Sequence, residues 1–220
     1  NPDRVALYGY AHVPWMAKRQ QMIHSDALPT PQERLELFET ARRLFLWDHY
    51  EEIGIDHFAT QSDGLSLAKK AGRLRRNFQG YTDDTAEALI GIGASSISRF
   101  PQGYAQNAAS TAQYQACVRE GEMATGRGHV FKGEDLWRSR MIEMLLCDFA
   151  IRTAPIVEEF GVSPAKLARM YAEVDRAFPK MTRTTPDGFE IVDEGRPLAR
   201  MIARAFDAYD MRAEGHSAAF

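Results

Sequence analysis

A strand, a helix and a second strand follow one another at the start of the chain, and this order limits the folds available to it. Residues 4–10 (RVALYGY) have the β-branched and aromatic content of a buried strand, which ends before Pro14 because proline lacks a ladder donor. Thr30 and Glu33 have the spacing of a helix N-terminus, and apolar residues then recur at helical spacing. Residues 55–59 (IDHFA) predict the second strand. A strand–helix–strand unit of this kind favours a parallel sheet or barrel, in which ligands bind at the carboxyl ends of the strands.

The middle of the chain is expected to contain one more strand and one more helix. Residues 88–98 (ALIGIGASSIS) are apolar and contain glycine, which predicts a strand that another backbone or a ligand approaches closely. A helix is expected from Ser110 to Glu120, before Gly121.

From Glu134 onward the pattern becomes helical, with a single hairpin. Ser163 followed by Pro164 is typical of a helix N-terminus. Residues 182–192 contain the turn signature Pro-Asp-Gly between alternating residues, and a last helix is expected after Pro197. Helix, helix, hairpin and helix in this order resemble a winged-helix unit. We therefore expect two domains: residues 1–133, an α/β part of a partial (β/α) barrel, and residues 134–220, a helical, winged-helix-like α+β domain.

Composition and charge argue against several classes of protein. No stretch approaches the roughly 20 consecutive apolar residues that a bilayer span needs, and the cytoplasm is the expected location. A formal net charge of −3 supplies no broad attraction to nucleic acid or anionic lipid. The two cysteines, Cys117 and Cys147, are too few for a disulfide framework. The chain opens at Asn1 directly on strand-like residues, which indicates truncation or processing.

The histidines and glycines do not form a complete catalytic set. None of the six histidines has a metal-ligand spacing such as HExxH, so no metal site is predicted. His12 and His57 each lie at a predicted strand, where they can line a site or serve a purely structural role, the commoner outcome. Gly91-Ile92-Gly93 lacks the third glycine of a dinucleotide-binding loop and is better explained as structural glycine in a crowded strand.

Five cations form the densest basic run of the chain and lead directly into residues 77–82 (NFQGYT): Lys69, Lys70, Arg73, Arg75 and Arg76. One interpretation is a solvated helix end, where cations interact favourably with free carbonyl groups. In the other, Arg73, Arg75 and Arg76 bind a carboxylate-rich ligand, because the guanidinium fork matches carboxylate geometry.

Four segments, in order along the chain, resemble bacterial oxygen-independent coproporphyrinogen III oxidases: residues 10–14 (YAHVP), 54–59 (GIDHFA), 76–82 (RNFQGYT) and 91–98 (GIGASSIS). The resemblance continues through residues 104–107 (YAQN) into the last helical region, so the chain is similar to the C-terminal half of such an enzyme. It implies that residues 1–133 are the C-terminal portion of a radical-SAM catalytic domain. RNFQGYT is the most specific piece, because it separates the oxidase from the haem chaperone of the same superfamily.

The resemblance implies an oxidoreductase of haem biosynthesis that converts two propionates of coproporphyrinogen III to vinyl groups, giving protoporphyrinogen IX. In this family a reduced 4Fe-4S cluster cleaves S-adenosylmethionine, and the 5′-deoxyadenosyl radical takes a hydrogen atom from the propionate side chain. A second S-adenosylmethionine binds beside the first. The family residues near that second molecule correspond here to Ala11, Phe78, Gln79 and Ile97.

The chain departs from the family at the cluster. The family holds its cluster on a C-x3-C-x2-C motif near the N-terminus, and Cys117 and Cys147 do not have that spacing. The resemblance therefore places the cluster ligands upstream of Asn1, assigns no catalytic residue to this chain and predicts that the chain alone is inactive. The implied partners are coproporphyrinogen III and a reducing electron donor, and an exposed strand edge predicts self-association.

Two other functions are weighed against this one. A haem chaperone would bind haem instead of acting on porphyrinogen, and RNFQGYT argues against it. A winged-helix nucleic-acid-binding module would use residues 163–177 as its recognition helix. Charge disfavours that module, because residues 134–212 contain 12 Lys and Arg against 14 Asp and Glu.

Overall fold

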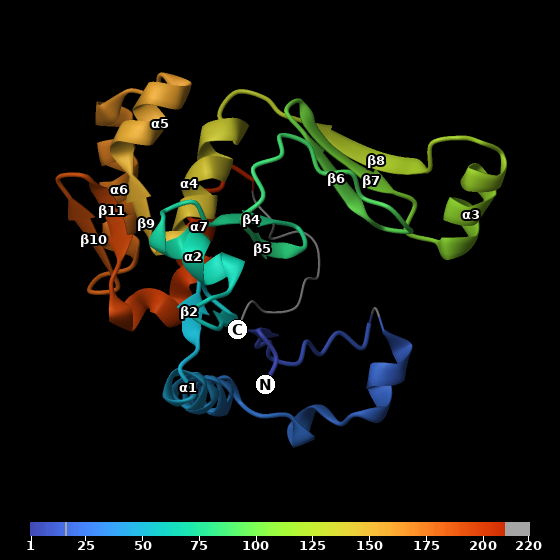
Figure 1. Cartoon of the computed structure of the whole chain (residues 1–220), viewed down its shortest axis with the longest axis horizontal. Coiled ribbons are helices and arrows are strands. Elements are labelled where there is room, and N and C mark those ends of the chain that lie inside the picture. Colours follow the sequence, from blue (N-terminus) through green and yellow to red (C-terminus); the bar gives the residue numbers. More distant parts are fainter. Residues whose placement is uncertain (16, 210–220) are drawn as a thin grey trace. The chain divides into compact units, whose positions relative to one another are not determined.

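The computed structural model describes residues 1–15 and 17–209, and the chain forms two compact units. The first combines Asn1–Asp83 with Trp137–Phe220, and the second is Asp84–Leu136. Helices and antiparallel strands make the fold mixed α/β (Figure 1). The sequence predicts a domain boundary after residue 133, close to the point where the second unit ends at Leu136. The predicted domains nevertheless group the segments differently from these two units, and they stay a prediction. Across the described residues, no helix combines the length and the apolar character needed to cross a membrane.

A three-stranded antiparallel sheet in the order β1-β3-β2 opens the first unit. Its strands are β1 (Arg4–Ala6), β2 (Glu51–Ile53) and β3 (His57–Ala59). β3 folds back from β2 at Gly54, which has φ +56°, and lies between the other two strands. The expected parallel arrangement of residues 4–10 and 55–59 is therefore wrong. The tight turn after β2 makes β3 the antiparallel neighbour of β1.

Helix α1 (Pro31–Trp47) begins where the sequence predicts. The Thr30 hydroxyl accepts a hydrogen bond from the Glu33 backbone N–H, and the Glu33 carboxylate accepts one from the Thr30 N–H at 2.7 Å. This reciprocal pair satisfies two backbone donors that a helix N-terminus otherwise leaves free. Two short 3-10 helices, η1 (Lys18–Met22) and η2 (Ser25–Ala27), lie between β1 and α1.

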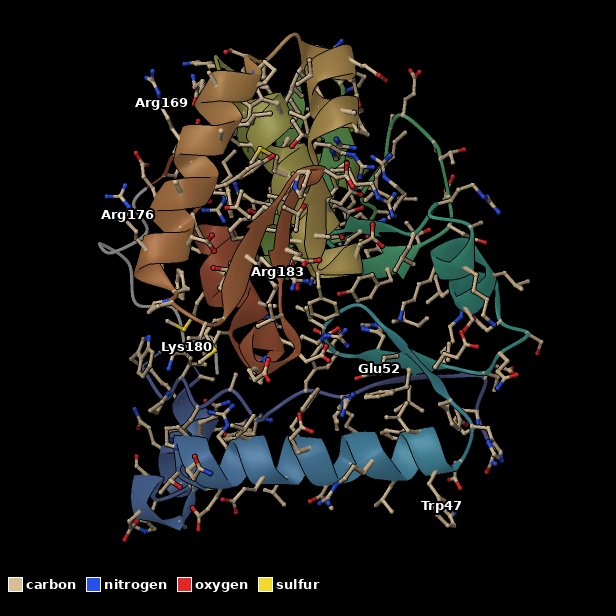
Figure 2. All side chains as sticks on the ribbon, turned by 90° about the vertical axis from the view of Figure 1, so that its left-hand side faces the viewer. Trp47, Glu52, Arg169, Arg176, Lys180 and Arg183 are labelled. Carbon is tan, nitrogen blue, oxygen red and sulfur yellow. The ribbon has the colours of Figure 1, made fainter. Side chains whose placement is uncertain are left out.

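Helix α1 packs against the sheet through one side. The rings of Phe45 and Phe58, on α1 and β3, have centroids 4.7 Å apart. Arg42 of α1 donates through two nitrogens to the carboxylate of Glu52 on β2, a residue labelled in Figure 2. A ring contact and a bidentate ion pair together fix the helix on this sheet.

Helix α2 (Gly64–Lys70) and the hairpin of β4 (Arg75–Asn77) and β5 (Gly80–Thr82) follow the sheet. The basic run therefore straddles two elements. Its two lysines lie in the last turn of α2, where the interpretation of the run as a solvated helix end places them. Arg75 and Arg76 instead belong to β4.

The C-terminal part of the first unit is built from helices and a second antiparallel sheet, in the order β10-β11-β9. The elements are α4 (Asp135–Asp148), β9 (Ala150–Arg152), α5 (Thr153–Phe160), α6 (Pro164–Ala177), β10 (Thr182–Thr185), β11 (Gly188–Ile191), η3 (Asp193–Leu198) and α7 (Ala199–Arg204). The predicted helix start at Ser163-Pro164, the hairpin and the last helix are confirmed. Fully buried side chains from these elements form the main core: Met141, Leu145, Ile151, Ile156, Leu167, Phe189, Ile202 and Phe206.

The second unit is a three-stranded antiparallel sheet with one helix (Figure 1). Its elements are β6 (Ile97–Phe100), β7 (Gly103–Asn107), α3 (Thr111–Arg119) and β8 (Thr125–Val130). The expected helix is confirmed, but the strand expected over residues 88–98 is wrong for most of its length. Within that described segment Leu89 makes an isolated bridge to Arg99, and the regular strand begins only at Ile97. Ile90 and Ile92 are 70% and 85% exposed, so the apolar pattern does not mark a buried strand.

Candidate functional site

The β4–β5 hairpin presents Phe78 and Gln79 at its tip. Asn77 pairs with Gly80 in the strand register, so these two residues form the connection. The Asn77 side-chain oxygen accepts a hydrogen bond from the Gln79 backbone N–H at 2.8 Å, which fixes the turn. Gly80 has φ +133°, a conformation that other residues rarely adopt. Both tip side chains are exposed, so both can contact a ligand.

The three arginines of the basic run have different surroundings. Arg73 is exposed just beyond α2. Arg75 Nε donates to Glu143 Oε1 at 2.8 Å, and the Arg76 backbone N–H donates to the same oxygen at 3.0 Å. The Arg76 guanidinium lies 5.5 Å from the centroid of the Tyr81 ring, and its Nε is buried without a hydrogen-bond partner. A buried donor of this kind is uncommon, so Arg76 is the arginine most suited to meet a ligand.

Tyr81 holds the hairpin against the rest of the first unit. Its hydroxyl donates to the Leu146 carbonyl oxygen at 2.7 Å and accepts from the Ile55 backbone N–H at 2.9 Å. Burial strongly raises the pKa of this hydroxyl. Gly54 makes room for it, since a Cβ there would lie 2.1 Å from the Tyr81 oxygen. Tyr81 is therefore a neutral structural anchor for the hairpin.

A carboxylate, an imidazole and a guanidinium lie beside the same hairpin. His57 Nδ1 is 2.6 Å from Asp56 Oδ1, and Arg200 of α7 donates to the other oxygen of Asp56. The His57 ring meets the Tyr81 ring edge-on with centroids 5.0 Å apart, and the Tyr8 ring at 5.9 Å. Partial burial and then the Asp56 charge raise the pKa of Tyr8. His57 thus stands in a polar cluster built from four elements or the turns beside them.

The sequence singled out His57 but not its partners. Asp56 precedes it directly, and an acidic residue next to a histidine was the available signal. Arg200 is 144 residues away from Asp56 along the chain, and nothing in the local sequence connects the two. The sequence likewise gave no reason to choose Arg76 over Arg75.

The two other residues of the predicted S-adenosylmethionine set lie elsewhere. Ala11 follows β1 in the loop, where its carbonyl oxygen accepts from Gln20 Nε2 at 3.0 Å. The neighbouring His12 has a buried Nδ1 without a hydrogen-bond partner. Ile97 opens β6 in the second unit, paired with Gln106. The structure therefore places Phe78 and Gln79 together, and the contribution of Ala11 and Ile97 to the same site stays a prediction.

The cysteines do not fit an iron–sulfur cluster. Burial, followed by the charges of Glu143 and Asp148, raises the pKa of the Cys147 thiol to about 12, which opposes the thiolate that iron requires. Cys117 lies on α3 in the second unit. Among the residues that the structure describes, no three His, Cys, Asp or Glu side chains are grouped as metal ligands.

Known proteins resemble this chain over nearly all of its length. An oxygen-independent coproporphyrinogen III oxidase of Paracoccus denitrificans is 63% identical over 219 residues, which is 100% of this chain and 49% of the relative. One from Cereibacter sphaeroides is 55% identical over 210 residues, 96% of this chain and 47% of the relative. No family model matches. The chain spans about half the length of the curated relatives it matches.

A solved structure of a similarly named protein has a fold like that of this chain. It is the coproporphyrinogen III oxidase of Escherichia coli, described as a radical SAM enzyme, and it is 33% identical to this chain with a TM-score of 0.86. The match covers 95% of this chain and 49% of the solved one.

Proposed function

This chain corresponds over its whole length to about half of an oxygen-independent coproporphyrinogen III oxidase, and from that premise we propose that it is the C-terminal half of such an enzyme. The full-length enzyme, as we call the longer protein, decarboxylates two propionates of coproporphyrinogen III oxidatively and gives protoporphyrinogen IX. The barrel and the winged-helix-like domain expected from the sequence belong to this proposal. A cytoplasmic location is also part of this proposal, and the free thiols of Cys117 and Cys147 are compatible with it.

The observation that carries the proposal is the buried, unpartnered Nε of Arg76. Both ligands of the reaction carry carboxylates, four on the porphyrinogen and one on the methionine part of S-adenosylmethionine. A carboxylate is the acceptor that a buried guanidinium N–H pairs with most strongly. Arg75 is already paired with Glu143, and Arg73 is exposed, so we assign the substrate contact to Arg76 first.

The residues at the hairpin tip suit the second S-adenosylmethionine. The Gln79 amide offers a donor and an acceptor, and Phe78 offers an exposed ring, 56% accessible, against which a ligand can pack. Ala11 and Ile97 complete this proposed set, as a small residue and an apolar wall. When bound in the full-length enzyme, the cluster and S-adenosylmethionine supply the radical chemistry. The residues of this chain orient the two ligands, and the cluster is held by residues outside it.

Replacement of Gln79 tests this function. In the full-length enzyme Gln79→Ala should lower protoporphyrinogen IX formation at limiting S-adenosylmethionine, while the visible absorption of the cluster stays unchanged. Gln61→Ala, at an exposed turn of the same unit, is the matched control. Unchanged turnover in Gln79→Ala would remove the residue from the site. Haem transfer by the parent protein without porphyrinogen turnover would instead favour the chaperone.

One surface bears on the nucleic-acid alternative. Arg169, Arg176, Lys180 and Arg183 lie along α6 and into β10, where Figure 2 shows them on the outer side of the unit. Acidic residues interrupt this row, however, because Arg183 pairs with Glu190 and the exposed Glu173 lies within α6. A nucleic-acid surface needs a continuous cationic face. We therefore retain the oxidase, and salt-dependent DNA binding by the chain would reverse this choice.

A further inference from the structure

The Asp56 carboxylate is buried and held from two sides. Its side chain is 5% exposed, and its two oxygens accept from His57 Nδ1 and from Arg200. The Asp56 backbone carbonyl oxygen also accepts from the Leu7 N–H at 2.8 Å, which ties this turn to the end of β1. A carboxylate so held can neither rotate nor choose another partner.

This arrangement decides which nitrogen of His57 is available. A carboxylate that is paired with a guanidinium only accepts hydrogen bonds, so Nδ1 donates to Asp56, and Nε2 is the ring nitrogen left for a ligand. No residue in the described part of the chain forms a hydrogen bond with Nε2. A carboxylate behind a histidine also stabilises the imidazolium form.

The Nε2 atom faces the hairpin that carries the proposed ligand contacts. A Cβ built on Gly80 would lie 3.5 Å from Nε2, at ordinary contact distance, so Nε2 lies directly beside the hairpin. Tyr81 links the two halves of the arrangement, because its ring contacts the His57 ring and lies under the Arg76 guanidinium. Arg76 Nε and His57 Nε2 are thus two polar atoms without protein partners beside one tyrosine.

We propose that His57 is a ligand-binding residue that donates from Nε2 to a carboxylate of a ligand held at the β4–β5 hairpin, with Asp56 and Arg200 as its positioning residues. The inference rests on the proposed function, since the carboxylate belongs either to the methionine part of S-adenosylmethionine or to a propionate of the porphyrinogen. To donate to a carboxylate, Nε2 must be protonated.

Two amide replacements separate the two nitrogens of the ring. His57→Asn places an amide nitrogen near Nδ1 and keeps the bond to Asp56, whereas His57→Gln places one near Nε2 and keeps a donor toward the ligand. His49→Asn is the matched control, at an exposed histidine with φ +63° that asparagine tolerates. In the full-length enzyme, calorimetry measures the Kd of S-adenosylmethionine and of coproporphyrin III, the stable oxidised form of the substrate.

We expect His57→Asn to raise the Kd of one of these ligands about tenfold or more, and His57→Gln to raise it less, because it keeps a donor toward the ligand. Asp56→Asn should raise the Kd of the same ligand and leave that of the other near the parent value. The ligand whose Kd rises identifies the source of the carboxylate. Values within about twofold of the parent for both ligands in His57→Asn would overturn the inference. Because binding is measured without turnover, a parent enzyme that binds but forms no protoporphyrinogen IX would contradict the proposed function and not this subsite.

Discussion

At the scale of single residues, a comparison of Arg76 with Arg73 tests whether an arginine of the basic run contacts a ligand or is an ordinary surface charge. Its Nε is buried without a partner, while Arg73 is exposed. Arg76→Gln in the full-length enzyme should raise the KM for coproporphyrinogen III about tenfold or more and lower kcat less, because a shielded charge-assisted hydrogen bond contributes about 1.5–3 kcal/mol. Arg73→Gln should leave both constants near those of the parent, since exposed charges contribute little. If steady-state kinetics shows the same values for both variants, the basic run is a solvated surface.

The buried thiol of Cys147 should make the free energy of unfolding depend on pH. Burial raises the pKa of its thiol to about 12, whereas in the unfolded chain the thiol titrates near its ordinary pKa of about 8.5. Between about pH 9 and pH 11 the unfolded state loses a proton that the folded state keeps, so the free energy of unfolding falls as pH rises. This group contributes a slope of up to about 1.4 kcal/mol per pH unit.

Cys147→Ala should flatten that slope, whatever the substitution costs at pH 7. Urea unfolding of parent and variant at pH 7, 9, 10 and 11 measures it. Tyr81, whose pKa burial also raises, is present in both proteins, and Cys147 makes the smallest contribution to that shift, so most of the Tyr81 effect cancels in the comparison. Parallel curves for the two proteins would mean that the thiol ionises in the folded state.

The family resemblance singled out the segment RNFQGYT of the site but not the residues that support it. RNFQGYT is contiguous, so Arg76, Phe78 and Gln79 could be proposed together, and a hairpin necessarily keeps them close. The contact between Asp56 and Arg200 could not be predicted from the sequence, because it depends on how α7 packs against the first sheet. The choice among the arginines depended on burial and on Glu143, which is 68 residues from Arg75. Local sequence thus proposes candidate binding residues, and tertiary packing decides which of their atoms are free.

At the scale of elements, the start of α1 gives a direct test of local encoding. Thr30→Ala removes a side-chain acceptor from the helix N-terminus and should lower the free energy of unfolding by about 1 kcal/mol. Thr40→Ala is the matched control inside the same helix. The Thr40 hydroxyl donates to the Glu36 carbonyl, and alanine has the higher helix propensity, so stability should not fall there. Chemical unfolding followed by circular dichroism compares the two, and equal values would remove the capping argument.

Helices were predicted more reliably than strands, for physical reasons that particular segments show. The starts of α1 and α3 are set by capping side chains, and that of α6 is marked by Pro164 in its first turn, all of which the sequence displays. Strand pairing depends on partners far along the chain. β3 became an antiparallel neighbour of β1 because the turn at Gly54 returned the chain beside it. Residues 88–98 have the apolar content of a strand, but only their last residues find pairing partners.

At the scale of the whole molecule, the described part of the first unit has exposed apolar side chains and a strand at the edge of a sheet. Leu37, Leu44 and Trp47 are 63%, 63% and 81% exposed along α1, and Figure 2 shows Trp47 at the end of that helix, pointing away from the ribbon. β1 is an edge strand of its sheet. Surfaces of this kind are normally covered. Because relatives are about twice as long, we expect the rest of the full-length enzyme to cover them, or a second copy when the chain is alone.

The last prediction is that the polypeptide from Asn1 to Phe220 is catalytically inert by itself. A 4Fe-4S cluster that activates S-adenosylmethionine takes three thiolates from one short motif, and this chain has two cysteines in all. Cys147 is 1% exposed with a raised pKa, and it lies in the first unit, whereas Cys117 lies in the second. Without the cluster no electron reaches the sulfonium group, so no radical forms.

Anaerobic reconstitution with iron and sulfide tests this, with the full-length enzyme treated in parallel as the positive control. The chain should retain no stoichiometric cluster and release no 5′-deoxyadenosine, whereas the full-length enzyme should do both. Binding of S-adenosylmethionine by the chain is a separate measurement, because the hairpin residues do not depend on the cluster. A stoichiometric cluster in the chain, together with 5′-deoxyadenosine, would show that residues within Asn1–Phe220 hold the iron and that the cluster does not come from another part of the enzyme.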